Sequence, residues 1–295
     1  MGGHRARKVL RASLLLRPDA SLDILSGSEY LERTCVKAYL DDALKGLLAE
    51  RPENPTKYLA KYFARVVTGA HVDGRNFEFV DLNVRNRLAF VSLVEASLSN
   101  VDDKYEMTID DFHQLVAIIC PGLPRMLLVQ ACGHLLEAEM PTEIPFKRLL
   151  TCFRACLVYN EFLGYVYGIY CDLARAEKMD DDVRRKDMAQ AKLSEAVVIR
   201  LRDEHHINHE KFTCPPLSVV EACMYTSATF KQFCGTLVEH VAIDAAITEL
   251  QAAYERVGEA ALRKGETAGD GPDADMLKAT RKVLKRRASK TSKRA

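Results

Sequence analysis

The sequence predicts an all-α protein, and three observations support this prediction. Glycine and proline are sparse, at 15 and 10 of 295 residues, which disfavours a fold with many tight turns. Apolar residues recur at spacings of three and four in most segments, as they do along one face of an α-helix. Most prolines stand between these segments, where a helix begins or ends.

The composition is that of a globular protein with a sizeable core, because 48% of residues are hydrophobic and 28% are charged. No stretch approaches 18 uncharged apolar residues, so no membrane span is predicted. The nine cysteines are an odd number, several lie in apolar helical patterns, and we find no secretory signal. We therefore expect reduced, mostly buried thiols rather than a disulfide framework.

Positive charge is concentrated at both ends of the chain. Residues 1–20 carry +4 and residues 277–295 carry +9, which leaves −12 between them for an overall charge of +1. A basic tail predicts an anionic partner, with nucleic acid, anionic membrane and the acidic tubulin surface as candidates. A solvated tail without a partner is the alternative, and the arginine-rich N-terminus also has features of a mitochondrial presequence. The predicted contact residues of the tail are Lys282, Lys285, Arg286 and Arg287.

Two amphipathic helices are predicted near the N-terminus. The first covers 30–50 and ends at Arg51-Pro52, since proline disfavours helical geometry in the residue before it. The second begins after an Asn54 cap, with Pro55 in its first position, and ends near Gly69. Two short helices bury little surface alone, so we expect this hairpin to dimerise or to accept a partner helix. The alternative is that its apolar residues close the protein's own core. The residues concerned are Leu40, Leu44, Leu47, Leu48, Tyr58, Leu59, Tyr62 and Phe63.

Further helices are predicted at 84–99, 109–120, 124–135, 146–175, 174–206 and 217–258. Thr108 is the predicted cap of the helix at 109–120, since the acidic pair after it suits a helix N-terminus. This pattern predicts five parts: a basic disordered N-terminus at 1–27, the hairpin at 28–70, an EF-hand-like helical domain at 71–175, C-terminal helices at 176–264, and a linker with a basic disordered tail at 265–295. Residues 106–163 follow the helix–loop–helix rhythm of paired EF-hands, with Ile144 where such loops carry a short strand. The loop at 136–143 lacks the alternating oxygen ligands and central glycine of a calcium site, so no calcium is expected.

The metal-like residues His205, His206, His209 and Cys214 form a cluster in the sequence. His205 and His209 are four residues apart and would face one ion from a helix. A hydrolytic His-Glu-x-x-His site needs glutamate after the first histidine, where this chain has His206. No phosphate loop, dinucleotide fingerprint or nucleophile elbow is present. We therefore predict a non-enzymatic protein with no catalytic, cofactor-binding or metal residues and no cofactor. A structural zinc site, or an enzyme centred on this cluster, is the alternative.

Two resemblances follow from the motifs. Residues 51–63, Arg-Pro-Glu-Asn-Pro-Thr-Lys-Tyr-Leu-Ala-Lys-Tyr-Phe, resemble the second helix of the RIIα/Dpy-30 dimerisation fold. Discontinuous motifs over 28–250 resemble the centriolar satellite-associated tubulin polyglutamylase complex regulator family. These motifs are Glu29-Tyr30-Leu31, Lys61-Tyr62-Phe63, Phe77-Glu78-Phe79-Val80, Cys120-Pro121, Tyr159-Asn160-Glu161-Phe162-Leu163 and Lys211-Phe212-Thr213-Cys214-Pro215-Pro216.

The family resemblance implies a regulatory or scaffold protein that binds subunits of the tubulin polyglutamylase complex. It implies a place in the cytoplasm and cytoskeleton, at centriolar satellites, the centrosome, the basal body or the cilium. The basic tail would then contact tubulin or microtubules, and a homodimer is an open alternative for the hairpin. Polyglutamylase complex subunit 1 has a similar dimerisation motif and a stretch like Leu150 to Phe153. It is one alternative, and an axonemal docking protein that uses the same hairpin is another.

Overall fold

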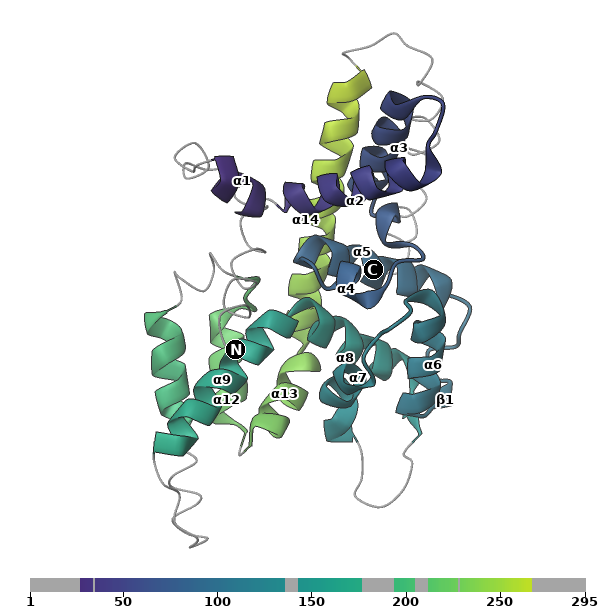
Figure 1. Cartoon of the computed structure of the whole chain (residues 1–295). Coiled ribbons are helices and arrows are strands. Elements are labelled where there is room, and N and C mark those ends of the chain that lie inside the picture. The colour runs from purple at the N-terminus through teal and green to yellow at the C-terminus, as the bar shows by residue number, and fades with distance from the viewer. Residues whose placement is uncertain are drawn as a thin grey trace, which may run out of the picture.

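The computed structural model describes residues 27–33, 35–135, 143–176, 194–204, 212–227 and 229–266. Helices dominate these residues, and the strands are two pairs of residues (Figure 1). The all-α prediction is therefore confirmed. Among the described residues, no helix combines the length and apolar character that a membrane crossing needs.

The N-terminal hairpin is formed by α2 (Val36–Glu50) and α3 (Pro55–Thr68), which pack against each other. The predicted end of its first helix and both ends of its second helix are confirmed. The backbone N–H of Arg51 bonds the carbonyl of Leu47 at 2.9 Å, and Asn54 accepts a hydrogen bond from the N–H of Lys57. Gly69 ends α3 with φ 75°, a left-handed conformation that glycine adopts without steric cost.

The prediction of one continuous helix over 30–50 is wrong. The structure has α1 (Gly27–Arg33), and α2 begins after Cys35. Cys35 has φ 56°, a conformation that no α-helix tolerates, and its side chain is only 2% exposed. Because the apolar period continues across the break, the sequence pattern does not show where α1 ends and α2 begins. The burial of the Cys35 side chain marks this position only in the folded protein.

The central part of the chain contains a short 3-10 turn, η4 (Ala70–Val72), followed by α4 (Phe77–Val80) and α5 (Val84–Ser97). It continues with α6 (Ile109–Ile119), α7 (Arg125–Cys132) and a second 3-10 turn, η5 (Gly133–Leu135). The predicted Thr108 cap is confirmed, because its side chain and that of Asp111 form a reciprocal capping box at the start of α6.

Two short strands connect the starts of two helices. β1 (Glu106–Met107) precedes α6, β2 (Ile144–Pro145) precedes α8, and they pair antiparallel with Met107 opposite Ile144. The strand expected at Ile144 is therefore present, and the EF-hand-like nature of the domain stays a prediction. Most of the loop considered for calcium, at 136–142, lies outside the described residues.

The long helix predicted at 146–175 is two helices, α8 (Phe146–Val158) and α9 (Asn160–Ala176), which is a second correction. The break is at Tyr159, whose φ is −100° and whose side chain is 2% exposed. Both α8 and α9 pack against α13, and α8 also packs against α5, α7 and α14. Both segments are too apolar for the sequence to show where they separate.

The C-terminal region contains a helical segment at 194–203 and three further helices. These are α12 (Leu217–Tyr225), α13 (Phe230–Val238) and α14 (Val241–Glu266), in place of the single stretch predicted at 217–258. Thr229 caps α13 by accepting a hydrogen bond from the N–H of Gln232. α14 extends two residues into the predicted linker at 265–295.

Most buried apolar side chains form one core, while the hairpin has a small cluster of its own. In the main core, the rings of Phe90, Phe112 and Phe153 meet edge to face. The small cluster contains Cys35, Tyr39 and Val66. α14 packs against α3 as well as α8 and α13, so it joins the hairpin to the body of the protein (Figure 1).

Candidate functional site

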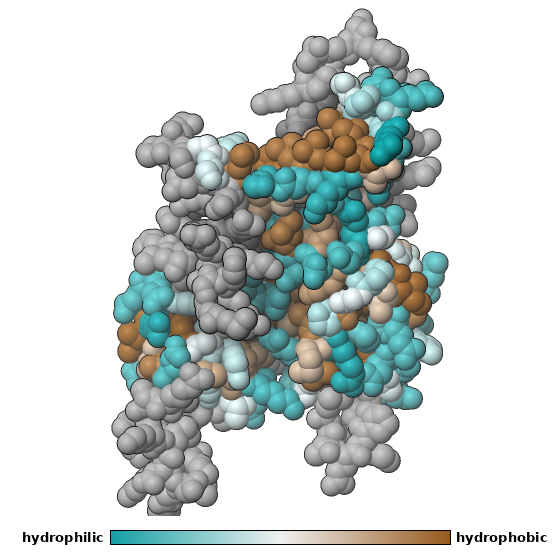
Figure 2. Space-filling model, in the orientation of Figure 1, coloured by the Kyte–Doolittle hydropathy of each residue, from teal (hydrophilic) through white to brown (hydrophobic). Residues whose placement is uncertain are grey.

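An exposed apolar face on α2 is the first candidate site. Leu40, Leu44 and Leu48 are 39%, 49% and 72% exposed, and their spacing of four places them in one row. We call this row the α2 face. Figure 2 shows it as part of a continuous brown strip along α2 in the upper part of the molecule. An apolar row of this kind on a surface is characteristic of a binding site.

The side chains that fix the orientation of α2 lie on its opposite face. Tyr39 is 5% exposed and Ala43 is fully buried. The hydroxyl of Tyr39 donates to Asn86 Oδ1 at 2.6 Å and accepts from Asn83 Nδ2 at 3.0 Å. Burial raises the pKa of Tyr39 to about 12, so this hydroxyl stays protonated. Because these bonds need Tyr39 inside, the row of leucines is left in contact with solvent.

His71 completes this polar network between the hairpin and α5. Its Nε2 lies 2.8 Å from Asn86 Oδ1, and its ring meets the rings of Tyr39 and Phe79 edge to face. Burial lowers the pKa of His71 to about 4, so the ring is neutral near pH 7. A neutral imidazole that donates from Nε2 satisfies the amide oxygen without placing a buried charge in the network.

The other residues predicted to bind a partner are half-buried within the hairpin. Tyr58 crosses α2 at Gly46, where a Cβ would lie in steric conflict with the tyrosine hydroxyl. The hydroxyl of Tyr62 donates to Asp42 Oδ2 at 2.7 Å, and Phe63 packs against the small cluster. The half-buried set is Leu47, Tyr58, Leu59, Tyr62 and Phe63. The structure thus separates the eight residues into an outward row and a set that also holds the two helices together.

Most of the other predicted site residues lie outside the part of the chain that the structure describes. The basic tail residues Lys282, Lys285, Arg286 and Arg287 lie there, as do His205, His206 and His209. Cys214 is described: it is half-buried, and its thiol donates to the carbonyl of Phe212 at 3.7 Å. All nine cysteines are in described positions, seven of them are buried, and none forms a disulfide, as the sequence predicted.

A second candidate site was missed by the sequence analysis. His134, Cys152 and Glu239 bring one possible ligand atom each to within 4.8 Å of one another. They come from η5, α8 and the end of α13. The spacing Cys132-Gly133-His134 was a weak signal for such a site, but the sequence does not place Cys152 or Glu239 beside it.

The fold and the first site define an all-helical protein with an exposed apolar row on α2. Comparison with known proteins gives a more particular likeness. Over 243 residues, the chain is 26% identical to the proteins named centriolar satellite-associated tubulin polyglutamylase complex regulator 1 from Homo sapiens and Mus musculus. Those alignments cover 75% of this chain and 73% of each relative. The Danio rerio protein of the same name is 27% identical over 156 residues, which is 50% of this chain and 47% of that protein. No family model matches, and no solved structure gives a significant match.

Proposed function

We propose that this chain is a non-enzymatic regulatory or scaffold protein that binds the tubulin polyglutamylase complex and modulates tubulin glutamylation. The observation that carries the proposal is the α2 face, a row of three exposed leucines on a helix that the body of the protein orients. The names of the relatives supply the identity of the complex. By the same likeness, the site of action is the centriolar satellite, with the centrosome and cilium as neighbouring locations.

The partner of the α2 face would be an amphipathic helix from a subunit of that complex. An apolar row with a spacing of four fits the apolar face of another helix. Leu47, Tyr58 and Leu59 lie half-buried beside it and would widen the contact. The RIIα/Dpy-30-like motif at 51–63 supports this mode of binding. A second copy of the chain is the other occupant that such a module accepts.

The strength of this contact follows from the exposed area. The exposed fractions of 39%, 49% and 72% amount to about one and a half leucine side chains. Burying one leucine stabilises a complex by about 1.5–3 kcal/mol, so the row contributes about 2–5 kcal/mol. Losing it weakens binding by roughly 30-fold to a few thousandfold.

Proximity labelling from the full-length tagged protein in ciliated cells tests the proposal. The wild-type chain is expected to capture a polyglutamylase catalytic subunit and its companions, and the variant Leu40→Ser/Leu44→Ser/Leu48→Ser is expected to lose them. The matched control is Ile118→Ser/Met126→Ser, since those side chains are 80% and 68% exposed on α6 and α7. Unchanged capture by the triple variant would refute a role for the α2 face.

Two other outcomes bear on the alternatives. Capture of radial-spoke or other axonemal proteins, without polyglutamylase subunits, would keep the docking face and reject the glutamylation role. Sedimentation of the purified chain tests self-association, because a homodimer that the triple variant converts to a monomer would make the second copy the occupant.

The basic tail would give the protein a second contact, with tubulin. Lys282, Lys285, Arg286 and Arg287 are part of a segment with charge +9, which suits the acidic surface of tubulin. Such contacts are screened by salt. A chain ending at Glu266 is therefore expected to bind microtubules more weakly at low salt, with a smaller difference as salt rises.

A further inference from the structure

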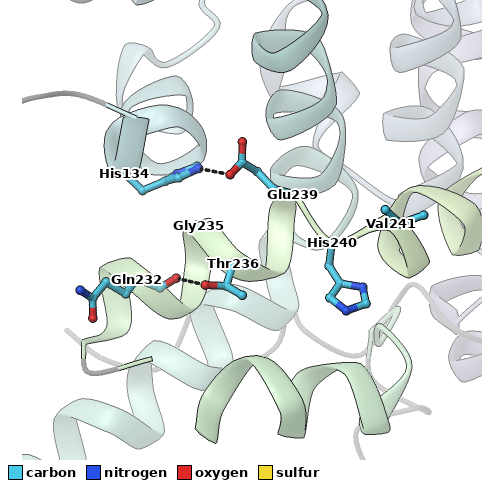
Figure 3. Close-up of a pocket in the computed structure, with 7 residues that line it drawn as sticks. All are labelled: His134, Gln232, Gly235, Thr236, Glu239, His240 and Val241. Carbon is cyan, nitrogen blue, oxygen red and sulfur yellow. Dashed lines mark hydrogen bonds and ion pairs between the residues drawn. The ribbon is translucent and has the colours of Figure 1, made fainter. Parts of the chain in front are cut away.

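A pocket between η5 and α13 contains the second candidate site. The pocket has a volume of about 610 Å³ and opens widely to solvent; His134, Glu239 and His240 are among the residues that line it. Figure 3 shows the His134 ring pointing toward the carboxylate of Glu239. Cys152 lies behind them in α8 and is fully buried. One side of the cluster is thus in the core and the other is accessible to an ion from solvent.

His134 is positioned closely but lacks good hydrogen-bond partners. Both ring nitrogens are buried, and neither has hydrogen-bond geometry to a group in the described part of the chain. α13 packs directly on the ring at Gly235, where a Cβ would lie 2.5 Å from His134 Cγ. A buried imidazole that lies 3.4 Å from a carboxylate without hydrogen-bond geometry to it fits a ligand site before its ion binds.

The distance between the histidine nitrogen and the glutamate oxygen matches that expected around a small tetrahedral metal. His134 Nε2 lies 3.4 Å from Glu239 Oε2. Two ligands at the usual zinc distances of about 2.0–2.1 Å, set at a tetrahedral angle, are about 3.3–3.4 Å apart. Adding a cysteine sulfur gives spacings of about 3.5–3.6 Å to the nitrogen and oxygen, within the 4.8 Å limit of this cluster.

A neighbouring cation supports an ionised carboxylate at Glu239. Arg148 pairs with both oxygens of Glu239 and keeps the carboxylate ionised; its Nη2 lies 3.1 Å from Oε2. A dication on Oε2 would displace Nη2, and Arg148 would keep its contact with Oε1. The side chain of Arg148 is 52% exposed and free to make that shift.

We propose that His134, Cys152 and Glu239 bind one Zn²⁺ ion, with water from the pocket in the fourth position. Mixed nitrogen, sulfur and oxygen ligands in a tetrahedral arrangement favour zinc over magnesium or calcium, which prefer oxygen alone. Binding releases the Cys152 proton, and the thiolate and carboxylate then neutralise the dication. The ion links the end of α13 to α8 and η5. This inference does not depend on the proposed function.

Cobalt titration of the purified full-length chain tests the site, because tetrahedral Co²⁺ with a thiolate ligand has a charge-transfer absorption band. The wild-type chain is expected to saturate with one Co²⁺ and to release it to Zn²⁺. The charge-transfer band is expected to disappear in Cys152→Ser and to weaken in His134→Asn. The matched control Cys223→Ser, which alters a buried thiol on α12, is expected to keep it.

Two more variants make the test decisive. Glu239→Gln changes a partly exposed side chain at the surface, so it reports on binding if Cys152→Ser does not fold, and it is expected to bind Co²⁺ more weakly. His205→Asn/His209→Asn is expected to keep the band. Loss of the band in that variant, its survival in Cys152→Ser, or the absence of saturable binding would each overturn the proposal.

Discussion

The buried guanidinium of Arg87 leads to a testable prediction about the stability of the fold. The Arg87 side chain is 0% exposed and joins α5 to α9 through Glu161, with Nη2 at 2.8 Å from Oε2. Its Nη1 also lies 3.3 Å from Asp81 Oδ1 and 3.2 Å from the Asp81 carbonyl. The positive charge of this buried guanidinium is therefore compensated by the carboxylates of Glu161 and Asp81.

Replacing Glu161 with leucine is expected to destabilise the protein strongly. Removing one partner of a buried ion pair costs about 3–5 kcal/mol, because the remaining charge is left without compensation. Asp81 keeps part of the compensation, so the expected loss lies near the lower end, about 3 kcal/mol. Urea unfolding at pH 7 measures the change in the free energy of unfolding.

The double variant Arg87→Met/Glu161→Leu provides the control. It removes both charges, and Asp81, whose side chain is 35% exposed, remains in contact with water. The double variant is therefore expected to be more stable than Glu161→Leu alone. A loss below about 1 kcal/mol in the single variant would refute the reasoning. So would a double variant that is no more stable than the single one.

Three more predictions address the hairpin, the pocket and the tail. The pKa of His71 is 6.5 in the unfolded chain and about 4 in the folded protein, so unfolding takes up a proton between these pH values. The free energy of unfolding is therefore expected to fall by about 3 kcal/mol as the pH is lowered from 6.5 to 4. Urea midpoints over this range are expected to vary less in His71→Gln. Gly235→Ala is expected to lower the free energy of unfolding, measured by thermal unfolding, by about 1–3 kcal/mol, because its Cβ would clash with His134. Gly168→Ala is the control, since a Cβ at that position meets nothing within 4 Å. Phosphomimetic changes at Ser289, Thr291 and Ser292 are expected to weaken microtubule co-sedimentation, and unchanged binding would count against a role for the tail.

Local signals in the sequence were sufficient for the ends of several helices. Asn54, Gly69 and Thr108 act through their own side chains or backbone within one turn, so their effect is independent of the rest of the fold. The all-α class follows in the same way, since it depends on apolar spacing and sparse turn residues. The burial of most cysteine side chains also followed from their apolar neighbours in sequence.

Contacts between distant segments decided the rest. The breaks at Cys35 and Tyr159 interrupt apolar patterns that continue on both sides, and only burial against other helices determines where they fall. The sequence shows a broad apolar stripe on α2, but the hydrogen bonds of Tyr39 to Asn83 and Asn86 determine that Leu40, Leu44 and Leu48 face solvent.

The candidate metal ligands in the pocket also depend on tertiary packing rather than on a local sequence signal. Its three ligand residues are separated by 18 and 87 positions, and no periodicity connects them. They meet because α7, α8 and α13 pack together and because Gly235 lets α13 approach His134. The sequence alone determined that the chain is helical and where several helices end, since both depend on neighbours along the chain. Only the tertiary structure decided which faces and side chains meet, because that depends on packing between segments far apart in sequence.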